Sequence, residues 1–112
     1  MDIDIRSQAE VKLIKLRGRL TLGEPVDRLR STIEELLATG NTRLVLDLEE
    51  VAMLDSSGIG LLARSLASAK QQGGSVKLLN PSKFATQTLK LVGILSLFET
   101  FEDQQTAITS FD

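Results

Sequence analysis

The segment Leu54–Gly60, LDSSGIG, concentrates the residue types of this chain that could do chemistry: one carboxylate, two hydroxyls and two glycines. A hydroxyl at the start of a helix stabilises it by accepting a backbone N–H bond, and Ser56 or Ser57 could do this alone. The neighbouring carboxylate of Asp55 is then more than a helix cap requires. A serine in such a place is also a candidate for phosphorylation, which would add about −1.5 to −2 charges at pH 7.

Catalysis at this segment is disfavoured by what the chain lacks. The sequence contains no His, Cys, Tyr or Trp, so a Ser-His-Asp triad and a thiolate nucleophile are excluded. No base is evident that could activate Ser56 as a nucleophile. The acids Asp47, Glu49 and Glu50 are better explained as a solvated strand end than as metal ligands. We therefore expect a binding protein without catalytic residues, metal or cofactor, and not an enzyme.

Length and charge point to one small domain. The chain has 112 residues and a formal net charge of −2, which suits a single domain over residues 1–112 and gives no reason to expect nucleic-acid binding. No apolar run is long enough for a membrane span. We expect a cytoplasmic protein without direct membrane contact. A basic strip in the early strands is best explained as a solvated face, with attraction to an acidic partner as the alternative (Lys12, Lys15, Arg17 and Arg19).

Around the segment, strand-like and helix-like patterns alternate. Short apolar or alternating runs predict strands at residues 3–6, 10–20, 42–48, 75–79 and 97–101. Amphipathic runs predict helices within residues 21–40, 57–72, 80–93 and 102–111. This alternation is typical of an α/β domain. The expected architecture is a small mixed, mostly parallel sheet with helices packed around it, in which the first strands pair antiparallel.

The periodicity also predicts which helix faces are buried. For the helix at 57–72 we expect a core face of Ile59, Leu62, Ala63, Leu66 and the stem of Lys70. We expect an outer face of Gly58, Leu61, Ser65 and Ser68, which is small and uncharged and would suit a partner surface. The two glycines of the first turns, Gly58 and Gly60, would leave the backbone open to that partner. In the helix at 80–93, Phe84, Thr88, Leu91 and Val92 are expected to face inward.

The same residues carry a family resemblance. LVLDLEEVAMLDSSGIGLLARSLASAKQQGGSVKLLNPS resembles the STAS domain of anti-sigma factor antagonists, whose D-S-S/T-G-apolar-G signature matches Asp55–Gly60. Three further segments are similar to the family. They are Gly73–Gly74 with Val76 and Leu78, the early pattern of Ile14, Leu16, Gly18 and Leu20, and the ending LKLVGILSLFETFED. The resemblance covers essentially the whole chain and implies the same fold.

The resemblance also implies a function. The unphosphorylated protein would bind an anti-sigma factor that is also a serine kinase, and so release a sigma factor for transcription. The kinase would phosphorylate Ser56 and end the binding, and a PP2C-type phosphatase would restore the active form. The partner surface implied in this way comprises Asp55, Ser56, Ser57, Gly58, Gly60, Leu61 and Thr21. Thr21 is a departure, because the family often has an Asp in that turn. The alternative is a STAS scaffold subunit of a lipid-transport or stress-sensing assembly that is not phosphorylated.

Overall fold

The computed structural model describes all 112 residues. Helices and strands alternate along most of the chain, as the sequence predicts. The elements are β1 (Asp2–Gln8), β2 (Val11–Leu20), α1 (Glu24–Ala38), β3 (Arg43–Leu54), α2 (Ser56–Gln71), β4 (Ser75–Leu79), α3 (Lys83–Leu91), the 3-10 helix η1 (Leu95–Leu97), β5 (Thr100–Phe101) and α4 (Gln104–Thr109).

The five strands form one sheet in the order β1-β2-β3-β4-β5. β1 pairs antiparallel with β2, and every other neighbouring pair is parallel. The connections explain the difference, because a tight turn joins β1 to β2 whereas helices return the chain between the later strands. The predicted mixed, mostly parallel sheet is confirmed.

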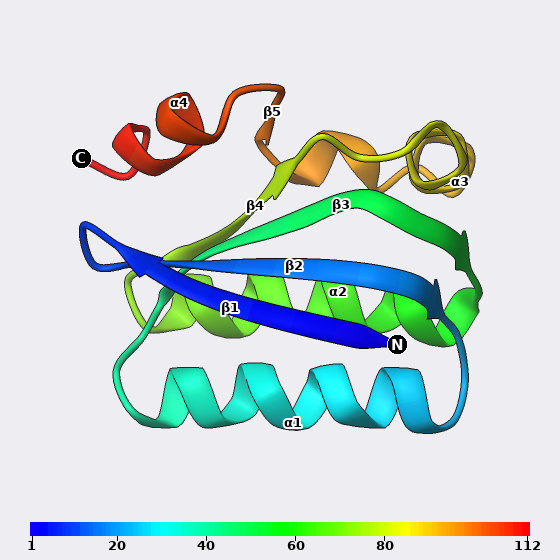
Figure 1. The fold of residues 1–112 in the computed structure, drawn as a ribbon, viewed down its shortest axis with the longest axis horizontal. Helices are drawn as coiled ribbons and strands as arrows, with labels where there is room; N and C mark the ends of the chain where they lie inside the picture. The colour runs from blue at the N-terminus through cyan, green and yellow to red at the C-terminus, as the bar shows by residue number, and fades with distance from the viewer.

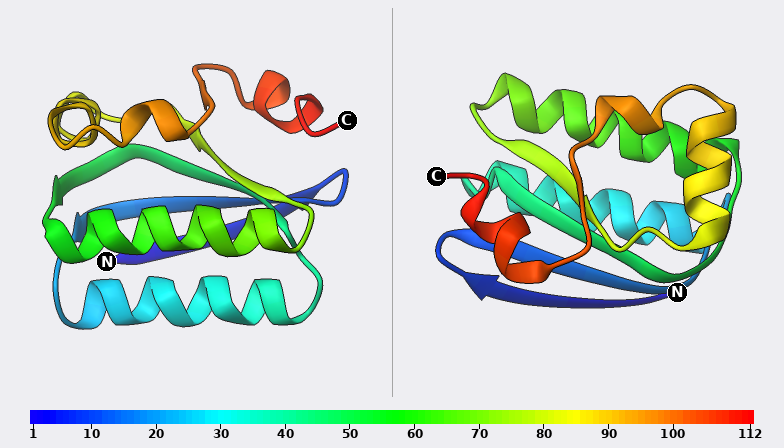
Figure 2. Two further views of the ribbon diagram at one scale, coloured as in Figure 1. Left: turned by 180° about the vertical axis from the view of Figure 1, so that it is seen from behind. Right: turned by 90° about the horizontal axis from the view of Figure 1, so that it is seen from above.

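Helices cover the two faces of the sheet unequally. α1 and α2 lie side by side on one face, and α4 lies on the other (Figure 1; Figure 2). A main cluster of 21 buried residues fills the α1/α2 side and includes residues of α3, whereas six buried residues lie between the sheet and α4. None of the helices has the length and apolar character needed to cross a membrane.

The first helix follows its sequence pattern. Val26, Leu29, Ile33 and Leu37 of α1 are buried, as their spacing predicts. A proline stands in the first turn, and the helix ends before Gly40, whose φ of 86° is the left-handed conformation that terminates helices. The length and orientation of α1 were therefore predictable from local signals.

The predicted faces of α2 are correct only in part: Leu62 and Leu66 are buried as expected, whereas the predicted outer face is wrong. Leu61 and Ser65, expected on the outer face, lie in the core, and Leu61 is only 3% exposed. Arg64 and Lys70 are exposed, so the outer face carries positive charge and is not neutral. The buried face is formed by Gly58, Leu61, Leu62, Ser65, Leu66 and Ala69. Apolar residues surround much of this helix, so its periodicity alone does not single out one stripe.

The predicted inward face of α3 is also wrong. Ala85 and Leu89 are its buried residues. Phe84, Leu91 and Val92, which we expected in the core, are exposed. The more apolar side of this short helix thus faces away from the sheet. In α4, by contrast, the buried residues are apolar ones, Ala107 and Ile108.

Candidate functional site

The predicted segment lies at a corner where three pieces of the chain meet. β3 ends at Leu54 and α2 begins at Ser56, so a single residue, Asp55, makes the turn. β2 pairs in parallel with β3 up to Leu20 and Leu54, so both strands end at the same edge of the sheet. The loop from β2 to α1 therefore runs beside the Asp55–Ser56 turn (Figure 1).

Asp55 holds this corner together. One carboxylate oxygen accepts a hydrogen bond from the N–H of Gly58 at 3.0 Å and so caps α2. The other oxygen accepts a hydrogen bond from the N–H of Leu22, 33 residues away in sequence, at 2.8 Å. The cap is therefore supplied by Asp55, and the alternative in which Ser56 or Ser57 serves only as the cap does not hold.

The two N–H groups also change the acidity of Asp55. The hydrogen bond from Leu22, followed by that from Gly58, lowers the pKa of the Asp55 carboxyl below its usual 3.8. Both bonds stabilise the ionised form, because a carboxylate accepts hydrogen bonds more strongly than a carboxylic acid does. Asp55 is thus a fixed anion whose oxygens are already occupied, which makes it a poor base for a neighbouring hydroxyl.

The two serines differ in accessibility. Ser56, the first residue of α2, is exposed, and Ser57 is half-buried. Because Asp55 supplies the cap, the Ser56 hydroxyl has no capping role. An exposed hydroxyl in the first turn of a helix can be reached by a modifying enzyme. It also lies at the end of α2 where the helix dipole favours negative charge.

The two glycines at the start of α2 have different structural roles. A Cβ at Gly58 would lie 2.3 Å from the backbone oxygen of Leu20, so only glycine lets α2 start this close to β2. Our interpretation that Gly58 opens the backbone to a partner is therefore wrong, since the residue is buried. A Cβ at Gly60 would meet only the mobile end of the exposed Arg64, at 3.0 Å. Gly60 is the glycine that leaves the helix surface open.

The surface around Ser56 is partly apolar. Leu22, which the sequence analysis missed, is 77% exposed beside Asp55, and Met53 is exposed at the end of β3. Thr21 is half-buried in the same loop. Leu22 stands alone between Thr21 and Gly23 and belongs to no apolar stripe. This isolation is the sequence signal that could have identified it as an exposed residue. The buried Leu61 presents no surface to a partner.

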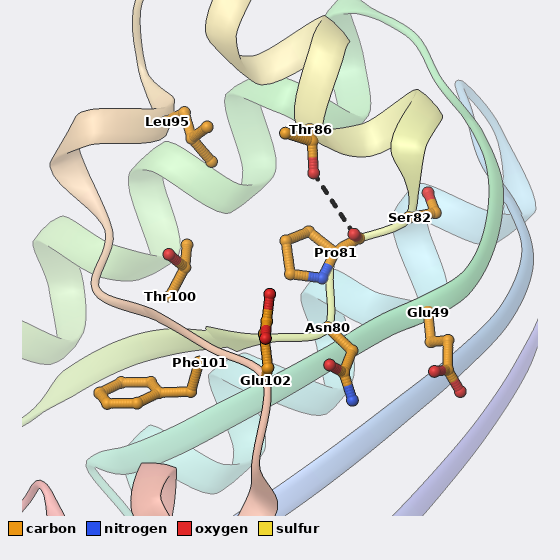
Figure 3. A pocket seen from close by; sticks show the side chains of 9 residues that line it. All are labelled: Glu49, Asn80, Pro81, Ser82, Thr86, Leu95, Thr100, Phe101 and Glu102. Carbon is orange, nitrogen blue, oxygen red and sulfur yellow. Dashed lines mark hydrogen bonds between the residues drawn. The ribbon is translucent and has the colours of Figure 1, made fainter.

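The largest hollow of the molecule lies elsewhere, between α3, η1 and the ends of β4 and β5. It measures about 870 Å³ and is lined mostly by polar residues (Figure 3). No predicted site residue lines it. The carboxylates of its two acids, Glu49 and Glu102, do not point toward one another, and no group of acidic residues in the chain could hold a metal ion. The hollow therefore lacks the converging charged groups of a catalytic centre.

Solved structures of similar fold include anti-sigma factor antagonists. The unphosphorylated form of SpoIIAA aligns over 97% of this chain and 95% of its own, with 23% identity and a TM-score of 0.83. The phosphorylated form of the Bacillus protein SpoIIAA aligns over 99% of this chain and 100% of its own, with 23% identity and a TM-score of 0.77. An anti-sigma factor antagonist from Mycobacterium paratuberculosis aligns over 98% and 92%, with 19% identity and a TM-score of 0.85.

These likenesses establish the fold, since their identities are low. The sequence provides the family: the STAS domain model matches residues 2–107, nearly the whole chain. The matched range includes the Asp55–Ser56 turn, the Leu22 loop and the sheet that positions them. Sequence and fold agree that this chain belongs to the STAS domain family.

Proposed function

We propose that this protein is an anti-sigma factor antagonist whose partner binding is ended by phosphorylation of Ser56. One observation carries the proposal: Ser56 is exposed at the first turn of α2, and Asp55 performs the capping that would otherwise explain a serine there. The hydroxyl is therefore available for modification at no cost to the helix cap. The existence of a phosphorylated form of SpoIIAA, a protein of similar fold, supports this reading.

The surroundings of Ser56 explain how a phosphate would act. Leu22 exposes apolar surface beside Asp55, and Met53 is exposed near the end of β3. Such surface contributes to binding when a partner excludes water from it. A phosphate at Ser56 would place about −1.5 to −2 charges beside the existing anion Asp55. Covering this charge with an apolar or acidic partner surface requires its desolvation, which is unfavourable. The fold remains intact, because Ser56 is not part of the core.

The proposed partner is a serine kinase of the anti-sigma factor class, and a PP2C-type phosphatase reverses the modification. The test is a binding titration with this kinase from the same organism, with and without ATP. Ser56→Asp is expected to weaken binding strongly without ATP. Ser56→Ala is expected to bind like the wild type but to remain bound after ATP is added. Ser31→Ala is the matched control, since Ser31 is also an exposed serine but lies in the middle of α1 and is not part of the proposed partner surface.

Two results would contradict the proposal. The first is equal binding and equal ATP response of the wild type, Ser56→Asp and Ser56→Ala. The second is an intact mass without phosphate after incubation of the wild type with the kinase and ATP. The second result would favour the alternative, a scaffold subunit that is not phosphorylated, as in lipid-transport or stress-sensing assemblies.

A further inference from the structure

The helix α3 presents its larger apolar side chains to solvent. Its buried residues are Ala85 and Leu89, whereas Phe84 is 40% exposed and Leu91 is 87% exposed. Burying a Leu or Phe side chain stabilises a protein by removing apolar surface from water, and this helix forgoes much of that gain. A stability rule that is broken without structural benefit is where a function is expected.

The exposed residues of α3 form two parallel rows. Phe84 and Leu91 are seven residues apart, which places them on one face of a helix. Lys83 and Lys90 have the same spacing and form a second row beside the first. Beyond the helix end, Val92 and Leu97 are also exposed apolar residues. We call these six residues the α3 surface.

The α3 surface is positively charged in an acidic protein. Residues 80–98 contain no Asp or Glu, although the whole chain has a net charge of −2. Neither Lys83 nor Lys90 takes part in any ion pair of the chain. Both ammonium groups are exposed and available to acidic groups from outside.

The position of α3 leaves this surface uncovered. α3 lies at the end of the molecule near the close of β3, and no other helix packs on its outer side (Figure 1; Figure 2). A two-fold contact between the α3 surfaces of two copies would bring two lysines from each copy, and no acidic residue of these surfaces, into one interface, and like charges at close range are unfavourable. The charge pattern therefore argues against a second copy of this chain and favours an acidic partner.

We propose that the α3 surface docks an amphipathic helix of a partner protein. That helix has an apolar row opposite Phe84 and Leu91 and acidic residues opposite Lys83 and Lys90. Apolar residues that repeat every seven positions, with charged residues beside them, are the pattern by which two helices pack and choose their partner. This surface shares no residue with the Ser56 corner, and we expect its binding not to depend on phosphorylation.

The test uses the full-length protein and a pair of synthetic helical peptides. Each peptide has about three heptads with leucines in the apolar row. One carries Glu in the flanking positions and the other carries Lys. In a ¹⁵N-HSQC titration, the Glu peptide is expected to shift the amide signals of residues 83–97 and to bind about tenfold more tightly than the Lys peptide, a difference of ~1.4 kcal/mol.

Surface variants separate the two rows. The double variant Phe84→Ser/Leu91→Ser is expected to lose Glu-peptide binding, and Lys83→Glu/Lys90→Glu is expected to prefer the Lys peptide. Ile5→Ser is the matched control, because Ile5 is also an exposed apolar residue but lies on β1. The substituted side chains of α3 are exposed, so circular dichroism melts are expected to show that all variants fold.

Several outcomes would overturn the proposal. Equal affinity for the two peptides, or signal shifts outside α3 and η1, would show that the rows do not select an acidic helix. A dimer in sedimentation velocity that Leu91→Ser abolishes would assign the surface to a second copy. Binding to phosphatidylserine vesicles that Leu91→Ser abolishes would assign it to a membrane. None of these outcomes bears on the Ser56 titration, so the two proposals fail independently.

Discussion

The carboxylate of Asp55 accepts a hydrogen bond from the backbone N–H of Leu22 at 2.8 Å, across 33 residues of sequence. The second oxygen of the same carboxylate caps α2 at Gly58. One side chain therefore sets the start of the helix that bears Ser56 and the position of the most exposed apolar residue beside it. The same side chain therefore positions both Ser56, the proposed modification site, and Leu22, the exposed apolar residue proposed to contact the partner.

Asp55→Ala is expected to loosen both sides of the corner. Loss of the carboxylate leaves the Leu22 and Gly58 N–H groups without their acceptor, so the loop after β2 and the first turn of α2 open more often. Hydrogen exchange measured by NMR is expected to accelerate at both amides and to stay unchanged in β4. Ser56→Ala is the control and is expected to leave both amides protected. Unchanged protection in Asp55→Ala would contradict the role assigned to this carboxylate.

Asp55 also predicts a pH dependence of stability. Its pKa is lowered in the folded protein by the Leu22 and Gly58 N–H groups. The folded state therefore binds the proton less readily than the unfolded state, and the stabilisation is complete above the ordinary pKa of 3.8. It is lost as the pH falls from that value through the lowered pKa.

The measurement is urea unfolding at pH 7 and pH 3 for the wild type and Asp55→Asn. The wild type is expected to lose more stability between the two pH values than the variant, because the variant cannot be protonated at this position. Glu50 and Asp103 also have lowered pKa values, so both proteins are expected to lose some stability in acid. Equal losses would show that Asp55 contributes nothing to the pH dependence.

The two glycines of α2 are expected to respond oppositely to alanine. Gly58→Ala places a methyl group against the backbone oxygen of Leu20, so we expect a loss of roughly 1–3 kcal/mol of unfolding free energy. Gly60→Ala meets only the flexible end of Arg64. It is expected to be neutral or to gain up to ~1 kcal/mol from helix propensity. Urea titration of both variants tests this contrast, which fails if both are destabilised equally.

Gly60→Ala has a second expected effect. If the partner approaches the open surface of α2, the added methyl group weakens kinase binding although the fold is no less stable. Ala67→Gly, at an exposed position further along the same helix, is a control for changes that affect helix stability alone. Wild-type affinity of Gly60→Ala would remove Gly60 from the proposed partner surface.

Lys77 is expected to hold the C-terminal helix α4 against the sheet. Its side chain on β4 is only 7% exposed, and its ammonium group lies 2.8 Å from the carboxylate of Glu99. It also donates hydrogen bonds to the backbone and side-chain oxygens of Ser110, at 3.1 and 2.7 Å, and lies over the ring of Phe111. All these partners belong to the last segment of the chain, which places α4 on the sheet.

Lys77→Ala is expected to destabilise the protein by roughly 1–3 kcal/mol, because Ser110 loses its donor and a gap opens beneath α4. Glu99→Gln is the matched variant. Since Glu99 is mostly exposed, its change is expected to cost less than ~1 kcal/mol. Hydrogen exchange in Lys77→Ala is expected to rise first in α4. Uniformly faster hydrogen exchange across the sheet would contradict a role of Lys77 that is limited to holding α4.

The sequence by itself determined the order of the elements and the place of the candidate site. Buried strands such as β4 were predictable because short apolar runs bounded by polar or glycine residues suit strands covered on both faces. The start and end of α1 were predictable because proline and glycine act through local backbone conformation. The LDSSGIG segment located the corner that bears Ser56, since its polar residues exceed what a helix start needs.

Only the tertiary structure decided which faces of α2 and α3 are buried and how the corner is held. Both helices carry apolar residues on more than one side, so periodicity permits several orientations. The orientation that forms depends on which part of the fold each helix packs against. In α2, for example, Gly58 lies directly against the backbone of Leu20. The bond between Asp55 and Leu22 was likewise unpredictable. It joins residues that are distant in sequence and becomes possible only because parallel β2 and β3 end at the same edge of the sheet.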